Sequence, residues 1–171
     1  SASELSDGYK PGDFSPRDAI DAVLAEVEAH NETLNCIVHV DAEGARAAAD
    51  LLAARWKSNA ALGPLDGVPV SIKDLFDLKG VPTLSGSLVS PETPAKDDAP
   101  AVARLREAGA VLFAKTATPE WGHIGVTESR RHGITRNPWN TERAAGGSSG
   151  GAGAALAAGM GPLALGSDGG G

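Results

Sequence analysis

GPLDGVPVSIKD, residues 63–74, joins a cluster of turn residues to a short apolar run that ends on two charged residues. Glycine, proline and aspartate favour a turn over residues 63–67, because they accept or fix the backbone angles that turns require. Residues 68–72 alternate with a period of two, which predicts a β-strand with a proline near its start. Lys73 and Asp74 therefore lie at the end of a strand.

A second strand, preceded by a helix, is predicted downstream. Asp98 is expected to cap this helix, with Pro100 in its first turn and Gly109 at its end. The apolar residues 111–114 then predict a buried strand. Residues 80–97 are rich in Gly, Pro, Ser and Thr and predict a long loop, a class that often carries function. A helix that leads into a short apolar strand is typical of an α/β protein.

The N-terminal region predicts another helix, preceded by a segment without regular structure. Residues 1–14 lack the charged and apolar regions of a secretory signal and are expected to form a flexible lead-in. Ser15, Pro16 and Asp18 then follow the pattern of a helix N-cap, with proline at the first helical position and an acid three residues after the serine. Apolar residues at helical spacing follow, and the helix is predicted to end near Asn31.

A short strand and a further helix are predicted next. Residues 34–40 alternate with a period of two, and Asp41 is expected to cap a helix that reaches Trp56. Cys36 lies in this strand without a neighbour that would stabilise a thiolate, so it is interpreted as an inert core thiol. Because it is the only cysteine, an internal disulfide framework and a CxxC metal site are excluded. A reducing compartment fits this cysteine usage, and the cytoplasm is the expected location.

The composition limits the function classes further. The chain has 171 residues, enough for one domain or for part of a larger one. Lysine and arginine number 15 against 22 acidic residues, giving a formal net charge of −7 without any basic run. A nucleic-acid-binding surface is therefore not expected, because it depends on clustered cations. Aromatic residues are only 4%, so the core must be built from small and aliphatic side chains.

The stretch from Ala144 to Ser167 contains no charged residue. Its length is compatible with a membrane-spanning helix, but its content of Gly, Ser and Pro is too high for such a helix. A buried helix over residues 151–158 and a short strand over residues 163–165 fit the pattern better.

Two glycine-rich clusters flank these elements. The first, GGSSGG at residues 146–151, precedes the alanine-rich helix and lets the backbone approach a bound group closely, as in an anion site. A linker of small residues is the alternative. The phosphate-binding loop GxxxxGK(S/T) requires a lysine that does not follow these glycines, and the dinucleotide-binding pattern GxGxxG fails because Leu156 stands at its last glycine position. Neither nucleotide-binding motif is therefore present. The second cluster, GSDGGG at residues 166–171, is compatible with an oxyanion hole or with a simple tail.

Some single residues that could take part in chemistry also allow two interpretations. Lys73 is either a solvated lysine or, if buried beside hydroxyl groups, a base whose pKa is lowered by desolvation. The four histidines lack the spacing of a metal site, and no metal is expected. His123 either lines a pocket or has no special role. Residues 136–140, RNPWN, predict a rigid turn with a packed aromatic side chain.

Taken together, residues 63–74, 97–122, 135–140 and 146–171 resemble the amidase signature family in their sequences, order and spacing. The resemblance extends from about Ser15 to Gly171. It implies an α/β fold in which a central mixed sheet is covered by helices on both faces. It also implies that residues 15–171 are the N-terminal part of a single amidase signature domain, ending directly before the family's nucleophilic serine.

The resemblance also implies the residues of the site. The family's triad consists of a lysine, a serine that follows a cis peptide bond, and a nucleophilic serine. The first two fall on Lys73 and Ser148, and the cis bond falls between Gly147 and Ser148. Ser149 and Asp168 would support the loop. The remaining positions carried over are the backbone N–H donors of the oxyanion hole, Gly169, Gly170 and Gly171, and the substrate-pocket positions Gly122 and His123.

The implied activity is hydrolysis of a carboxylic amide through an acyl-enzyme, without a cofactor. The expected partners are a small-molecule amide substrate and the remainder of the same enzyme after residue 171. Formation of a homodimer is compatible with the resemblance. Neither nucleic acid nor a membrane is expected as a partner. Two alternatives stay open, namely the glutaminase subunit of a glutamyl-tRNA amidotransferase and a non-catalytic binding module. The segment TPEWGHIGVTES at residues 118–129 departs from that subunit's usual sequence, which favours a stand-alone amidase.

Overall fold

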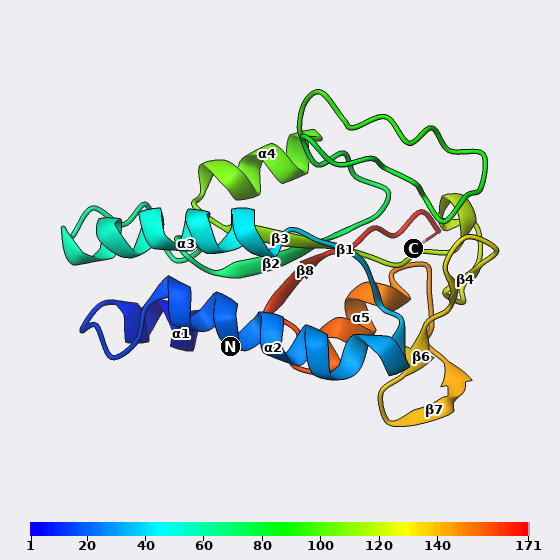
Figure 1. The fold of residues 1–171 in the computed structure, drawn as a ribbon, viewed down its shortest axis with the longest axis horizontal. Coiled ribbons are helices and arrows are strands. Elements are labelled where there is room, and N and C mark those ends of the chain that lie inside the picture. Colours follow the sequence, from blue (N-terminus) through cyan, green and yellow to red (C-terminus); the bar gives the residue numbers. More distant parts are fainter. Residues whose placement is uncertain (171) are drawn as a thin grey trace.

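A four-stranded mixed sheet forms the centre of the computed structural model, which describes residues 1–170 (Figure 1). The strand order is β1-β3-β2-β8, and β2 runs parallel to both β3 and β8, whereas β1 runs antiparallel to β3. The expected α/β fold with a central mixed sheet is therefore confirmed. The four strands are β1 (Ile37–Val40), β2 (Pro69–Lys73), β3 (Val111–Thr116) and β8 (Leu163–Leu165).

Helices cover both faces of this sheet because successive residues of β3 point to opposite sides. Val111 and Phe113 belong to the larger apolar core, together with residues of three helices. Leu112 belongs to a second core with Val102 of a fourth helix. Figure 1 shows α4 on one side of the sheet and α2 and α5 on the other. These helices are α2 (Pro16–Leu34), α3 (Ala42–Lys57), α4 (Pro100–Glu107) and α5 (Gly150–Ala157).

Local signals determine where α2 and α3 begin. Ser15 and Asp18 form the expected capping box at the start of α2, and the Asp41 side chain accepts a hydrogen bond from the N–H of Gly44 at the start of α3. Helix α2 ends at Leu34, about one turn later than predicted, where Asn35 adopts a left-handed conformation with φ of 49°.

The segment predicted as a flexible lead-in instead contains helix α1 (Ala2–Tyr9). Ser1 and Glu4 form a capping box at its start. Tyr9 at its end is 3% exposed, and its hydroxyl donates a hydrogen bond of 3.1 Å to the carbonyl of Gly67. Residues 1–14 are thus attached to the turn that precedes β2. No local sequence pattern predicts this contact.

The predicted cap of α4 is wrong. Ala99 occupies the N-cap position, and no side chain caps this helix. The carboxylate of Asp98 instead accepts hydrogen bonds from the backbone N–H of Lys79 at 2.8 Å and from Nε of Arg106 at 2.6 Å. These two partners hold Asp98 against the start of the neighbouring loop. Residues 80–97 contain no helix or strand, so the predicted loop is confirmed.

The uncharged stretch forms α5 and β8, as predicted. Within residues 1–170, no helix has both the length and the apolar character that crossing a membrane would need. Between β3 and α5 lie a single 3-10 turn and two small hairpins. They are η1 (Glu120–Gly122), the β4–β5 hairpin (Glu128–Ser129 and Gly133–Ile134) and the β6–β7 hairpin (Arg136–Asn137 and Asn140–Ala144).

The expectation of a packed aromatic in residues 136–140 is wrong. Trp139 is 81% exposed at the turn between β6 and β7. Its backbone N–H donates to the side-chain oxygen of Asn137 at 2.9 Å. This local hydrogen bond supports the turn, so the turn does not depend on burial of the indole ring.

Candidate active site

Lys73 is the last residue of β2 and its side chain is fully buried. Its Nζ lies 2.7 Å from Oγ of Ser148, 2.9 Å from Oγ of Ser149 and 2.9 Å from Oγ of Ser167. Of the two readings of this lysine, the solvated one is therefore excluded. Three segments that are far apart in sequence meet here, because β2 lies next to β8 in the sheet and α5 packs against both.

Two effects of opposite sign act on the pKa of Lys73. Burial lowers the pKa of Lys73, because its ammonium group loses the hydration that it has in water. The negative charge of Asp168 acts in the opposite direction and raises the pKa of Lys73, but its effect is smaller. Within residues 1–170, the close partners of Nζ are hydroxyl and carbonyl oxygens rather than carboxylates.

The loop that carries Ser148 is held from behind by residues 125–127. The peptide bond between Gly147 and Ser148 is cis, as the resemblance implied. A Cβ atom on Gly147 would lie 2.8 Å from the backbone nitrogen of Val126, so only glycine fits at this position. Thr127 Oγ1 donates to the carbonyl of Gly146 at 2.9 Å and accepts from the N–H of Gly150 at 3.0 Å.

The same region of the structure argues against an anion site at the first glycine cluster, residues 146–151. The N–H of Gly150 binds Thr127, and the N–H of Gly151 donates to the carbonyl of Ala117 at 3.3 Å. Both donors are therefore used inside the protein. The glycines serve close backbone packing at the start of α5 and place the two serines beside Lys73.

Ser148 and Ser149 have different hydrogen-bond partners. Ser149 Oγ donates to the carbonyl of Ser167 at 3.0 Å and accepts from its N–H at 3.1 Å. Among residues 1–170, Lys73 is the hydrogen-bond partner of Ser148 Oγ. Ser149 Oγ thus donates to a carbonyl, whereas Ser148 Oγ accepts a hydrogen bond from Nζ of Lys73.

The segment after β8 contains the remaining residues of the carried-over site. Asp168, Gly169 and Gly170 are exposed, and the N–H of Gly170 donates to the carboxylate of Asp168 at 3.2 Å. Gly171 lies outside the described residues. The assignment of these three glycines as oxyanion donors therefore stays a prediction.

A cavity of about 650 Å³ opens beside Ser148 and Ser149. Its walls come from the β6–β7 hairpin, which contributes Trp139, from the glycine-rich loop and α5, and from Ser167 and Asp168. Asp168 is the one ionisable side chain among the described residues that line it.

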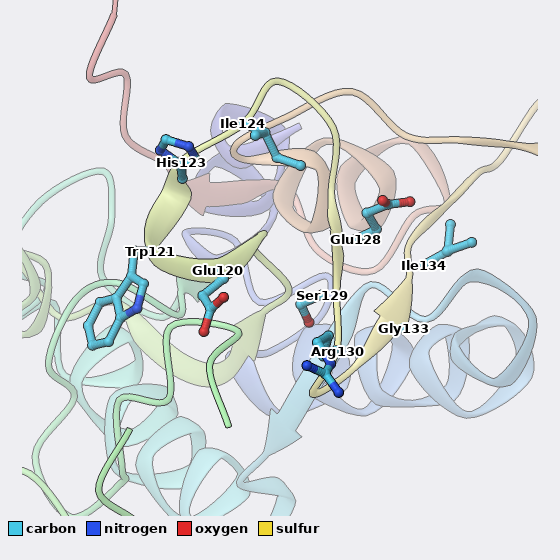
Figure 2. Close-up of a pocket in the computed structure, with 9 residues that line it drawn as sticks. All are labelled: Glu120, Trp121, His123, Ile124, Glu128, Ser129, Arg130, Gly133 and Ile134. Atoms are coloured by element: carbon cyan, nitrogen blue, oxygen red, sulfur yellow. The ribbon is translucent and has the colours of Figure 1, made fainter. Parts of the chain in front are cut away.

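The two predicted pocket residues lie in different places. A Cβ atom on Gly122 would be 3.6 Å from Oγ of Ser148, so Gly122 borders the site. His123 instead lines a separate cavity of about 470 Å³ between η1 and the β4–β5 hairpin. Figure 2 shows His123 on the η1 side of this cavity and Glu128 and Ile134 on the hairpin side.

Sequence reasoning did not assign Ser167 or Thr127 to the site. Ser167 stands directly before Asp168, two residues after the end of β8, and this position in the sequence was the one indication of its role. Thr127 offers no local signal, because its contacts depend on the path of the chain between η1 and the hairpins. Cys36 is buried as expected, and burial raises the pKa of its thiol to about 11. Within residues 1–170 no group of acidic, histidine or cysteine side chains is arranged to hold a metal ion.

The sequence model described as Amidase matches residues 18–171. The chain belongs to the amidase signature family. It is 43% identical over 169 residues to an acylamidase of Rhodococcus erythropolis, covering 99% of this chain and 35% of that protein. It is 42% identical over 171 residues to a glutamyl-tRNA(Gln) amidotransferase subunit of Salinispora arenicola (strain CNS-205), covering 100% of this chain and 35% of that protein.

The fold of this amidase-family chain is also found in solved structures. A structure of a vestigial protein complex of an s-triazine catabolic enzyme superimposes with a TM-score of 0.92 and 44% identity. That match covers 96% of this chain and 36% of the other. The chain thus spans about a third of the length of the relatives that it matches.

Proposed function

We propose that the protein containing this chain hydrolyses a carboxylic amide through an acyl-enzyme, with Lys73 and Ser148 relaying the proton of a nucleophilic serine that follows Gly171. The described residues would form the N-terminal part of its catalytic domain. The observation that carries the proposal is the buried Lys73 amine, which has three serine hydroxyls within 2.9 Å.

The relay requires an uncharged amine. Such an amine has two N–H bonds and one lone pair, so it can donate to Ser149 and Ser167 and accept from Ser148. The lowered pKa of Lys73 supports this state. Ser148 is the suitable relay because its oxygen is the nearest, and because the Ser149 proton is already donated to the Ser167 carbonyl.

The proton balance is then complete in each half of the reaction. As the nucleophilic oxygen attacks the amide carbon, its proton passes to Ser148 and the Ser148 proton passes to Lys73. When the C–N bond breaks, the same path returns a proton to the leaving amine. Water repeats the sequence on the acyl-enzyme and releases the carboxylate. The backbone N–H groups of Gly169 and Gly171, and that of Gly170 once it leaves the Asp168 carboxylate, would stabilise the oxyanion in both halves.

The glutaminase subunit of a glutamyl-tRNA amidotransferase is the second candidate. It is supported by 42% identity with such subunits, which is close to the 43% identity with the acylamidase. The two candidates differ in substrate, since the first would cleave a free alkyl or aryl amide and the second glutamine. Comparing turnover of glutamine and of a simple anilide by the full-length protein distinguishes them.

The proposed relay is tested with Lys73→Ala and Ser148→Ala in the full-length protein. The rate of labelling by a fluorophosphonate, which reacts with activated serines, is expected to fall by about 10²- to 10⁴-fold in each variant, as is typical for loss of a general base. Ser6→Ala serves as the matched control, because Ser6 is a buried serine of α1. It is expected to be labelled at the wild-type rate. Labelling of a folded Lys73→Ala protein at the wild-type rate would refute the relay.

A further inference from the structure

A second buried lysine lies on the strand next to Lys73. Lys115 of β3 is 1% exposed, and its Nζ is 2.6 Å from Oδ1 of Asp74, which is buried as well. Nζ of Lys115 also donates to Oγ1 of Thr83 at 2.9 Å. The proposed relay uses neither member of this ion pair, although Asp74 directly follows Lys73 in the sequence.

The strand register places the pair and Lys73 on opposite faces of the sheet. In the parallel ladder, Ile72 lies beside Lys115 and Lys73 lies beside Thr116. Residues in register share a face and successive residues alternate, so Lys115 is on the face opposite to Lys73. Asp74 continues this alternation, since its backbone N–H still bonds to the carbonyl of Thr116 at 3.0 Å.

The consequence is that the carboxylate nearest to Lys73 in sequence does not contact its amine. Asp74 is held instead by Lys115 and by the loop after β2, where the N–H of Leu84 donates to Oδ1 at 3.4 Å and the N–H of Ser85 donates to the main-chain carbonyl at 3.1 Å. A buried carboxylate without such a cation would act on Lys73 through a medium of low dielectric constant. It would favour the charged ammonium form.

We propose that Lys115 is a positioning residue for the reaction, which neutralises Asp74 on the far face of the sheet and so allows Lys73 to lose its proton. This inference rests on the proposed function, because it assigns a role through Lys73. It gives the ion pair an electrostatic task that is separate from holding the fold together.

Other charges lie close to these groups. Asp168 faces Lys73 from the segment after β8. His132, in the turn between β4 and β5, lies near both Asp74 and Arg131; burial lowers the pKa of His132, while the charge of Asp74 raises it. A protonated His132 could replace Lys115 as the partner of Asp74. The Lys115 variant is therefore also measured together with His132→Gln.

The test follows the rate of fluorophosphonate labelling of the full-length protein as a function of pH. On the acidic side of this profile the labelling rate rises with pH, and the pH at which it reaches half of its maximum is the midpoint. In Lys115→Met the charge of Asp74 is left unbalanced, so this midpoint is expected to move to higher pH by about half to one pH unit. In Asp74→Asn the charge of Lys115 is unbalanced, and the midpoint is expected to move to lower pH by about the same amount. The double variant is expected to return close to the wild-type midpoint.

The opposite directions separate this role from a structural one, which would lower the rate without moving the midpoint. Arg104→Met and Glu107→Gln break an exposed ion pair on α4 and are expected to leave the midpoint unchanged. Single variants that share one direction, or that do not move the midpoint, overturn the proposal.

Two further outcomes are distinguishable. If one single variant does not fold, the other carries the test with its own predicted direction; if neither folds, Lys115→Arg must retain the wild-type midpoint, and a shifted one overturns the proposal. If the wild-type protein is not labelled, or if Lys73→Ala is labelled at the wild-type rate, the proposed function itself fails.

Discussion

Lys73 exchanges the hydration of an exposed ammonium group for three hydroxyl partners inside the protein. Hydroxyl groups satisfy N–H donors but do not compensate a full positive charge, as a carboxylate would. Lys115 provides the contrast on the adjacent strand, since it is equally buried but paired with Asp74. Two buried lysines in neighbouring strands therefore have different close partners, hydroxyl groups for Lys73 and a carboxylate for Lys115.

Burial of Lys73 makes the stability of the folded protein depend on pH. The pKa of Lys73 is lower in the folded protein than in the unfolded chain, where the ordinary value applies. Between these two values the unfolded state binds more protons, so the free energy of unfolding rises with pH. Lys73→Met removes this contribution. We expect the stability of the wild type relative to Lys73→Met to increase as pH rises toward the ordinary lysine pKa, in urea unfolding experiments at a series of pH values. A constant difference would show that Lys73 titrates normally in the folded state.

Helix α5 places the serine loop through close contact of its first turn with the ends of two strands. A Cβ atom on Gly151 would lie 2.4 Å from the backbone nitrogen of Ala117 and 2.8 Å from the carbonyl oxygen of Cys36. Backbone atoms in a sheet cannot move aside as a flexible side chain could. Gly153, in the same helix, has no atom within 4 Å of its Cβ position. The two glycines therefore have different reasons to be present.

This difference predicts opposite effects of the same substitution. Gly151→Ala is expected to destabilise the protein by about 1–3 kcal/mol through overpacking and to slow fluorophosphonate labelling, because α5 must move away from β3. Gly153→Ala is expected to stabilise it by up to about 1 kcal/mol, because alanine is the better helix former. Chemical unfolding of both variants measures the two changes. Equal effects would mean that α5 does not pack against β3 as described.

The same elements show how far a sequence can be interpreted. The starts of α2 and α3 were predictable because Ser15 and Asp41 cap their helices through contacts within three residues. Asp98 has the same local appearance, but its carboxylate is bound by Lys79 and Arg106. Local patterns cannot reveal this competition between partners.

The candidate site depends even more on distant pairing. The roles of Lys73 and Ser148 were taken from the family resemblance, and no spacing rule would bring together residues that are 75 positions apart. Their meeting follows from the parallel pairing of β2 with β8, in which Ile72 lies beside Leu165. One feature distinguishes Lys115: it is the single charged residue of β3, a strand that is buried at all six positions.

The N-terminal segment acts on the scale of the whole molecule. Tyr9 joins α1 to the turn before β2 through its hydrogen bond with Gly67, and its ring lies 5.5 Å from that of Phe14 and 5.6 Å from that of Trp56 on α3. These contacts hold the first helix against parts of the chain that are about 50 residues away in sequence. They also lie at the end of β2 that is opposite to Lys73.

This arrangement predicts that Tyr9 supports the fold without taking part in the reaction. Tyr9→Ala is expected to lower the free energy of unfolding by about 3–5 kcal/mol, because it removes a large buried ring. Tyr9→Phe keeps the ring and removes only the hydrogen bond to Gly67, so a loss of about 1 kcal/mol is expected. Gly67 and Lys73 are separated along β2 by about 20 Å, at roughly 3.3 Å per residue. The fluorophosphonate labelling rate of folded Tyr9→Phe should therefore equal that of the wild type. If Tyr9→Ala unfolds at the wild-type urea concentration, α1 is not docked in solution and the N-terminal segment is flexible after all.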